Sequence, residues 1–196
     1  MAAKRRIEMM EENRAKMIAA ARTAFADKGF ANTSMDELTA SVGLTRGALY
    51  HNFGDKRGLL AAVVAQIDSE MAQRARASAA NTSDDWERLL AEGIAYINMA
   101  LEPEVRRIVL LDGPAFLGDP TQWPSQNNCL EFTQQTITEM MERKVVKDMD
   151  AKVAAHLLNS AALNAALLIA ASDAPHKTLP HVIEVFALLA SGLRNN

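Results

Sequence analysis

The sequence predicts an all-α protein with two parts. Gly and Pro are few, at 9 and 6 of 196 residues, and Ala is abundant, which favours helix over sheet. Apolar residues recur with a helical period along the chain, and no segment alternates as a strand does. They make up 49% of the chain, enough for a substantial core. We expect a three-helix N-terminal domain over residues 1–55 and a larger helical body over residues 56–196.

The N-terminal part carries the start and stop signals of three helices. Gly29 is placed as a C-cap for the first helix, expected over residues 8–28. Ser34 followed three residues later by Glu37 fits a capping box, which would satisfy two backbone N–H groups at the start of the second helix. Thr45 can cap the third helix. Helical spacing predicts their inward-facing residues: Met17, Ala21, Ala24, Phe25, Leu38, Val42, Leu49 and Phe53.

The body is expected to hold six further helices. Asp55 caps the first of them, which connects the two parts, and Pro103 opens a short one. The segment "DGPAFLGDPTQWP" holds three of the six prolines and is expected to interrupt the helices. Pro175 and Pro180 bracket the start of the last helix. The expected ranges are 56–78, 84–100, 103–111, 125–147, 151–171 and 179–193.

Charge is divided unevenly along the chain, whose net charge is −3. Residues 1–60 hold ten Lys or Arg and seven Asp or Glu, which gives +3; residues 61–196 hold eleven and seventeen, which gives −6. A basic first part joined to an acidic body favours an acidic partner for the first part. Lys4, Arg5 and Arg6 would add a salt-dependent attraction to phosphate.

The composition indicates a cytoplasmic protein with no membrane partner. We find no run of eighteen apolar residues, and the charged start "MAAKRRIEMMEENRAK" lacks the apolar centre of a signal peptide. Cys129 is the single cysteine, so neither a disulfide framework nor a thiolate zinc cluster is expected. His176 and His181 lack an acidic partner at metal-ligand spacing. We therefore predict no metal and no cofactor.

The stretch "GLTRGALYHNF", residues 43–53, predicts DNA recognition. Two short helices joined by a Gly-containing turn describe a helix-turn-helix. The outward side of the second helix is neither apolar nor generally charged, and Arg46 at its start can take a guanine in bidentate fashion. The residues expected on or beside this DNA-binding face are Thr45, Arg46, Gly47, Ala48, Tyr50, His51 and Lys56.

Residues 20–63 as a block resemble the DNA-binding head of the tetracycline-repressor (TetR) family of bacterial regulators. The shared features are the Ala-Phe…Lys-Gly-Phe end of the first helix, Thr-Ser before the second, and "G-L-T-R-G-A-L-Y-H-N-F-x-x-K-x-x-L". The resemblance implies an all-helical dimer whose body binds a small molecule. It also implies DNA contacts at Ser34, Thr45, Arg46, Tyr50 and Lys56, and variable contacts at His51 and Asn52. The family more often has His at the position of Asn52.

The last two helices are expected to form a homodimer interface. Residues 151–171 are apolar almost all round, and residues 179–193 carry a wide apolar stripe. Such helices must be covered on both sides. Paired with their copies, they would present two heads to a palindromic double-stranded DNA operator with half-sites about 34–36 Å apart. The alternative is a monomer in which both helices are core.

A small-molecule site is expected in the body, because aromatic residues, Phe132 among them, concentrate over residues 86–132 around the Pro-containing interruption. Small-molecule sites are mostly apolar with a few polar groups. The alternative is that these aromatic residues are core. The candidate ligand-binding residues are Trp86, Tyr96, Met99, Asp112, Phe116, Trp123 and Asn164.

These features predict a ligand-responsive, sequence-specific transcriptional regulator, a repressor released from its operator by an unidentified small molecule. An enzyme is not expected, because "DGPAFLGD" is neither a dinucleotide fingerprint nor a P-loop. The alternatives are an enzyme, or a helical small-molecule-binding or scaffold protein, without DNA affinity. If the protein is a scaffold, changing Arg46 and Tyr50 to Ala is expected to alter no measurable property.

Overall fold

The structure, a computed structural model, describes residues 2–195, without the side chains of residues 2–4 and 126–128. Lys4 of the predicted basic N-terminus therefore lies outside the described side chains. Within the described residues every helix or strand element is a helix, which confirms the all-α prediction. The α-helices are α1 (Ala2–Lys28), α2 (Met35–Ser41), α3 (Arg46–Phe53), α4 (Lys56–Ala79), α5 (Asp85–Asn98), α6 (Gly113–Leu117), α7 (Pro124–Glu142), α8 (Ala151–Ala171) and α9 (Pro175–Ser191).

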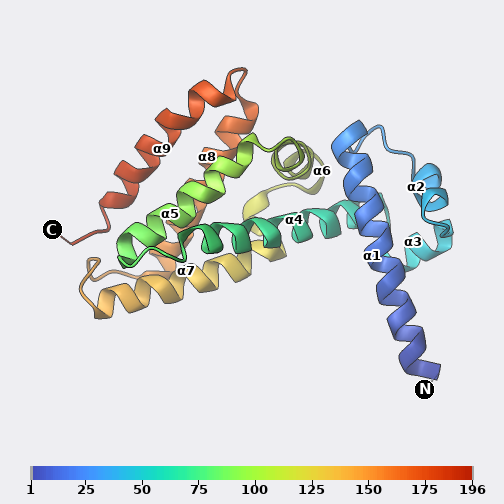
Figure 1. Ribbon diagram of the computed structural model, residues 1–196, viewed down its shortest axis with the longest axis horizontal. Coiled ribbons are helices and arrows are strands. Elements are labelled where there is room, and N and C mark those ends of the chain that lie inside the picture. Colours follow the sequence, from blue (N-terminus) through green and yellow to red (C-terminus); the bar gives the residue numbers. More distant parts are fainter. Residues whose placement is uncertain (1, 196) are drawn as a thin grey trace.

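The helices form a small head and a larger body, with α4 running from one into the other (Figure 1). The head consists of α1, α2 and α3. One apolar core continues through both, because the buried Phe25 and Leu49 of the head and the buried Leu59, Ile67 and Met71 of α4 belong to the same cluster. The α4 helix is therefore packed into the cores of both the head and the body.

Side-chain caps begin the head helices at the residues that the sequence predicts. Ser34 Oγ accepts from the backbone N–H of Glu37 at 3.4 Å, and Thr45 Oγ1 accepts from the N–H three residues on at 3.2 Å. The predicted capping box at Ser34 is half formed. The Glu37 carboxylate pairs with Lys28 Nζ at 3.2 Å, so this side chain serves the contact between α1 and α2 instead.

Three helix ends differ from the expectation. The first helix begins at Ala2 rather than near residue 8. α7 ends at Glu142 rather than near residue 147, because the following turn puts Lys144 at a φ of 58° and the chain then pairs with the C-terminal segment. α9 begins at Pro175 and contains Pro180, which therefore lies within the helix at the cost of one backbone hydrogen bond.

The interruption in the body is more helical than predicted. Residues 103–111 were expected as an ordinary helix, but Val105–Asp112 forms a π-helix, η2, preceded by a 3₁₀ turn, η1 (Met99–Leu101). The Pro-containing segment after it forms α6 and a second 3₁₀ turn, η3 (Pro120–Gln122). π-Helical turns cluster at functional sites, and this one lies between the body and α1.

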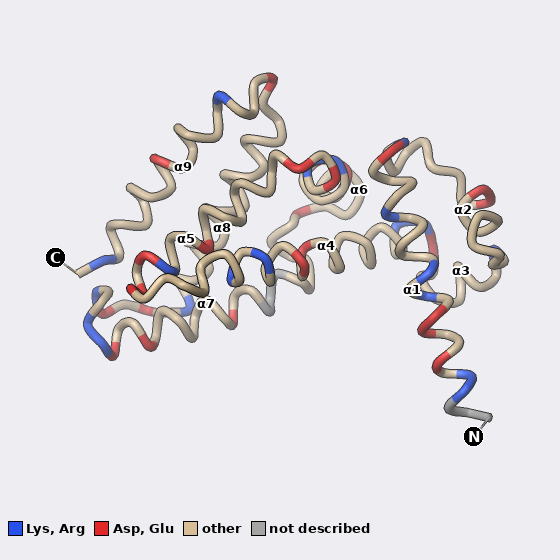
Figure 2. Tube along the Cα trace, viewed as in Figure 1, with Lys and Arg blue, Asp and Glu red and all other residues tan. Residues whose placement is uncertain are grey.

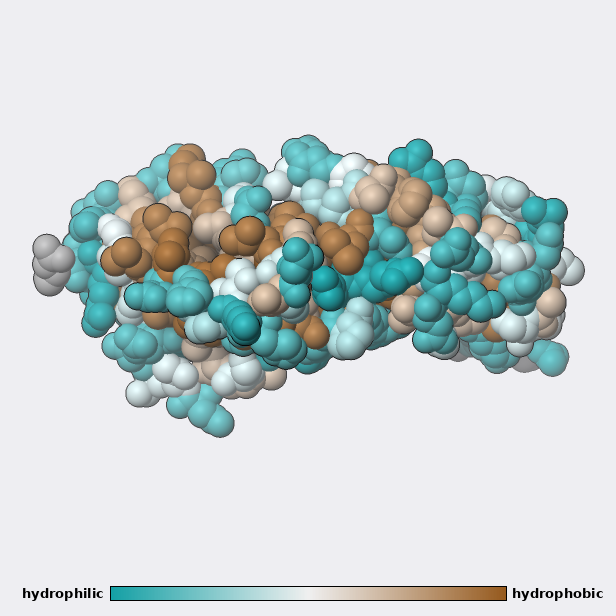
Figure 3. All heavy atoms as spheres, turned by 90° about the horizontal axis from the view of Figure 1, so that it is seen from above, coloured by the Kyte–Doolittle hydropathy of each residue, from teal (hydrophilic) through white to brown (hydrophobic). Residues whose placement is uncertain are grey.

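One side of α8 and α9 is apolar and exposed. Charged residues are sparse along both helices (Figure 2), and brown apolar atoms gather on this part of the surface (Figure 3). The other side of α8 packs against α5, α7 and α9. By length and hydropathy α8 would also suit a membrane span, as many core helices do. The α8–α9 face is defined by its exposed large residues, Val153, Leu157, Leu168, Val185, Leu188 and Leu189.

Candidate nucleic-acid interface and cavity

The third helix is fixed to the head by its inner side and leaves its outer side open. Leu49 is buried, and Phe53 packs against the same core. The backbone N–H of Gly54 closes the helix by bonding to Tyr50 O at 2.9 Å, with Gly54 at a φ of 76° that favours glycine. The helix is thus a rigid, short element with one buried and one free side.

The open side carries the predicted recognition residues. Tyr50 is 53% exposed, and Arg46 and His51 are also exposed. A Cβ added at Gly47 would meet only Thr45 Oγ1, at 3.7 Å, so nothing in the head stands above this position. Arg46 Nε lies 3.0 Å from Asp36 Oδ1, which ties the start of α3 to α2 while both side chains remain in solvent. This arrangement can meet the floor and edges of a DNA groove.

Four other predicted residues have contacts within the head. Ser34 and Thr45 act as caps, and Asn52 Nδ2 donates to Ala48 O at 2.7 Å. Lys56 differs from the rest, since its Nζ donates to Ala31 O at 3.3 Å and lies 4.5 Å from the centre of the Phe30 ring. Burial lowers the pKa of Lys56, and the nearby Asp112 opposes that shift. A phosphate contact by Lys56 stays a prediction.

Gly58 fixes how α3 meets α4. Its N–H donates to Asp55 Oδ1 at 2.7 Å, and a Cβ added to it would lie 1.9 Å from Phe53 O, a backbone atom that cannot move freely. We expect Gly58→Ala to lower the free energy of unfolding by about 1–3 kcal/mol, the usual cost of overpacking. Urea denaturation followed by circular dichroism measures this change.

Gly47→Ala is the matched control, because its new methyl group meets open space inside a helix. That variant is expected to be as stable as the parent or up to about 1 kcal/mol more stable, since Ala favours helix over Gly. Equal stability of Gly58→Ala and the parent would show that the α3–α4 junction is not tightly packed.

The head is also bonded to the π-helix and α6. The Phe30 N–H donates to Asp112 Oδ2 at 2.8 Å, and the Phe30 ring lies 4.5 Å from the Phe116 ring. Arg57 Nε donates to Phe116 O at 2.8 Å. Asp112 and Phe116 were predicted to bind a ligand, but their contacts place them at the head–body junction. Nothing in the sequence indicates that the segment around Asp112 and Phe116 packs against the head.

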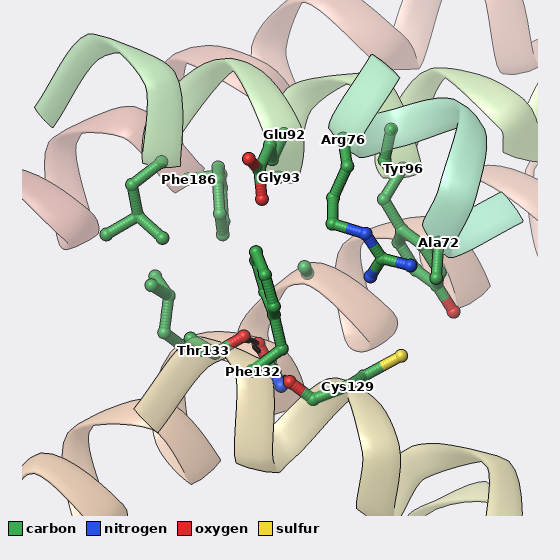
Figure 4. Close-up of a pocket in the computed structure, with 14 residues that line it drawn as sticks. Ala72, Arg76, Glu92, Gly93, Tyr96, Cys129, Phe132, Thr133 and Phe186 are labelled. Carbon is green, nitrogen blue, oxygen red and sulfur yellow. Dashed lines mark hydrogen bonds between the residues drawn. The ribbon is translucent and has the colours of Figure 1, made fainter. Parts of the chain in front are cut away.

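A cavity of about 100 Å³ lies among α4, α5, α7, α8 and α9. Leu89, Leu158, Phe132 and Phe186 are the large apolar residues of its wall. Phe132 rises from α7, and Phe186 and Glu92 lie on another side of the space (Figure 4). A larger outer groove, between α4 and the start of α7, shares the Arg76 and Phe132 side chains with the cavity. Arg76 and Phe132 therefore lie at the mouth of the cavity, where it opens into the outer groove.

The polar groups of the cavity are few and distinct. Burial raises the pKa of Glu92, while the positive charges of Arg76 and Arg88 act to lower it. Burial also raises the pKa of Cys129 to about 11, so its thiol stays protonated and unreactive. Asn159 Oδ1 accepts from Thr133 Oγ1 at 3.1 Å, and its Nδ2 is buried with no hydrogen-bond partner among the described side chains.

The structure brings few of the predicted ligand residues together. Tyr96 lines the cavity, whereas Trp86 and Met99 are buried in the core. Trp123 is also buried and borders a separate cleft beside α6, and the exposed Asn164 lies on the α8–α9 face. Sequence reasoning did not select Arg76, Glu92, Cys129, Thr133, Asn159 or Phe186. A lone charge within an apolar stretch, as in "LLAEGIAYI" around Glu92, is the signal that would have indicated one of them.

The exposed third helix on a compact three-helix head defines a helix-turn-helix DNA-binding protein with a helical body. Two family descriptions match the chain: "Bacterial regulatory proteins, tetR family" over residues 17–63 and "Tetracyclin repressor-like, C-terminal domain" over residues 86–193. The second covers more than half of the chain. This protein therefore belongs to the TetR family of transcriptional regulators, whose members bind operator DNA, dimerise and respond to small molecules.

Individual relatives agree with this assignment. A solved TetR-family transcriptional regulator from Pectobacterium atrosepticum is 44% identical, with a TM-score of 0.87 over 96% of this chain and 97% of that chain. The regulator TtgR of Pseudomonas putida is 31% identical over 105 residues, 52% of this chain and 49% of TtgR. AcrR of Shigella flexneri is 27% identical over 145 residues, 69% of this chain and 67% of AcrR. This chain thus spans about half the length of TtgR and two thirds of AcrR.

Proposed function

We propose that this protein is a cytoplasmic homodimer that binds a palindromic operator and is released from it by a small molecule. The observation that carries the DNA-binding role is the open outer side of α3. Arg46, Tyr50 and His51 are exposed there, and the Gly47 position lets a surface approach the helix backbone closely. The start of a recognition helix is where base edges are met in the major groove.

The exposed α8–α9 face supports the dimer. Leu157, Leu188 and Leu189 are 64%, 71% and 66% exposed, which is a large apolar area to leave in water. A two-fold axis that pairs α8 and α9 with their copies would cover this face and give the dimer two heads. The two third helices would then read the two halves of a palindrome.

The head–body junction supports a release mechanism. The cavity lies beside the body half of α4, and the head is bonded to η2 and α6 through Phe30, Asp112 and Phe116. A molecule that fits the cavity better in one arrangement of these helices favours that arrangement and therefore the corresponding spacing of the heads. It weakens DNA binding only by the difference between its affinities for the two states.

Selection of random duplex DNA with the purified full chain, at about physiological ionic strength, tests this function. Enrichment of a palindrome with fixed half-site spacing is the expected result. A folded, dimeric sample that enriches no sequence, with and without added small molecules, would overturn it. Catalytic turnover without DNA affinity would then favour the enzyme alternative. The absence of both DNA binding and turnover would favour a scaffold.

A further inference from the structure

The cavity is small enough that a single ring would fill it. Its volume is about 100 Å³, below the range of about 300–1,000 Å³ that is usual for drug-sized ligands. An apolar cavity of about 150 Å³ binds benzene in another protein, so a ring bound here would fill the whole cavity and its substituent would extend through the mouth toward the outer groove. Phe132 and Phe186 contribute aromatic faces to the wall (Figure 4), and aromatic rings pair well in offset or edge-to-face contacts. A small planar molecule fits these walls better than a long flexible chain.

Arg76, at the mouth of the cavity, forms no ion pair with a carboxylate among the described residues. Burial raises the pKa of Glu92 across the cavity, and the charge of Arg76 acts to lower it. The Arg76 guanidinium lies 5.0 Å from the centre of the Phe132 ring, and no ion pair or hydrogen bond joins it to an acidic group among the described residues. By contrast, the nearby Arg74 on the same helix pairs with Glu102. A guanidinium remains charged at any physiological pH, and its planar fork matches a carboxylate. A guanidinium that forms no ion pair at this position therefore favours a ligand with a carboxylate at the mouth.

The inner end of the cavity offers a donor and an acceptor. Glu92 lines the inner cavity but not the outer groove, and no hydrogen bond to its carboxyl is formed among the described residues. Asn159 Nδ2 is a buried N–H donor that has no hydrogen-bond partner within the part of the chain that the structure describes. A hydroxyl both donates and accepts, so it suits groups of both kinds. A ligand that left either group buried and unpaired would lose affinity.

We propose that the cavity binds a single-ring aromatic carboxylate that carries a hydroxyl at the opposite end of the ring. The carboxylate pairs with Arg76 at the mouth, the ring contacts Phe132 and Phe186, and the hydroxyl meets Glu92 and Asn159. The assignment names the chemical class of the effector, so its regulatory meaning rests on the proposed function. A benzylic amine is disfavoured, because its ammonium group would approach the Arg76 guanidinium.

Calorimetric titration of the protein with three probes of similar size tests the proposal. The probes are 4-hydroxybenzoate, its neutral analogue 4-hydroxybenzamide and the cationic 4-hydroxybenzylamine. The acid is expected to bind at least about tenfold more tightly than the amide, as for loss of a charge-assisted hydrogen bond, and the amine more weakly still. Equal affinities, tighter binding of the amine, or no binding of the acid at millimolar concentration would overturn the assignment.

Substitution at Arg76 locates the site. Arg76→Met is expected to weaken the acid at least about tenfold and to change the amide by less than about threefold, while Arg76→Lys falls between the parent and Arg76→Met for the acid. Arg74→Met removes the same charge two residues away, outside the cavity, and is expected to change neither affinity. Urea midpoints confirm that each variant is folded. A loss of acid binding in Arg74→Met equal to that in Arg76→Met would show a general charge effect and refute the assignment.

Operator release is measured separately, so that the two proposals can fail independently. If the acid binds but does not change the affinity for the selected operator, the effector role is refuted and the assignment of the ligand site is retained. Failure of the DNA selection with intact, Arg76-dependent binding of the acid would refute the regulator and again leave the site. Operator binding without Arg76-dependent binding of the acid would refute the site alone.

Discussion

Leu188→Glu is expected to make the protein monomeric and to weaken binding to a selected palindromic operator by about 10²- to 10⁴-fold. The factor is the usual gain from linking two binding modules. Leu188 is 71% exposed on the α8–α9 face, so a glutamate there is solvated in a monomer. In the proposed dimer it would bury a carboxylate among the leucines of two copies, and an unpaired buried charge is costly. Light scattering gives the mass in solution, and a gel-shift titration gives the operator affinity.

Leu111→Glu is the matched control, because Leu111 is also an exposed leucine, at 39%, but belongs to η2 and not to α8 or α9. It should remain dimeric and bind the operator as the parent does. A dimeric Leu188→Glu protein with the parent's operator affinity would place the dimer interface elsewhere. A parent that is monomeric at micromolar concentration would refute the dimer itself.

Arg46→Ala is expected to cost about 1–3 kcal/mol of operator binding for each half-site and to relax specificity at one base pair in each. The reason is the loss of a bidentate contact to a base. Tyr50→Phe, by contrast, removes a hydroxyl placed to bond to phosphate, so it should weaken all sequences about equally. Binding of the selected operator and of single-base variants of it separates the two patterns.

The ion pair with Asp36 adds a second effect. Arg46 Nε lies 3.0 Å from Asp36 Oδ1, so Arg46→Ala leaves a bare carboxylate on the DNA-facing surface. Asp36→Asn combined with Arg46→Ala is expected to recover part of the lost affinity but not the specificity. Arg74→Ala removes an equal charge from α4, away from α3, and should leave specificity unchanged. Parent-like specificity in Arg46→Ala would show that this arginine does not read a base.

Much of the head followed from local signals. Ser34, Thr45 and Asp55 begin helices at the predicted residues, because a cap depends on a hydrogen bond within three residues of sequence. The inward and outward sides of α3 likewise follow from a rotation of 100° per residue. The resemblance of residues 20–63 to the TetR head depends on the same local signals, and the family matches confirm it.

The cavity could not be predicted in the same way. Its walls come from five helices spread between Lys56 and Ser191, and Arg76 and Glu92 face one space only because α4 packs against α5. Asp112 illustrates the converse. A polar residue in a Pro-containing segment looks like a ligand-binding residue. The Asp112 carboxylate instead accepts a hydrogen bond from the Phe30 N–H of the head. Nothing near Asp112 in the sequence indicates that partner.

The sequence by itself determined the all-helical class, the three head helices and the family, because helix propensity, capping and periodicity act over a few residues. Tertiary structure alone decided the π-helix at Val105–Asp112, the end of α7 at Glu142, the contacts of Lys56 and Phe116 at the junction, and the shape and polarity of the cavity. These features depend on which helices pack together. Packing balances contacts between distant residues, and no local window of sequence contains both partners.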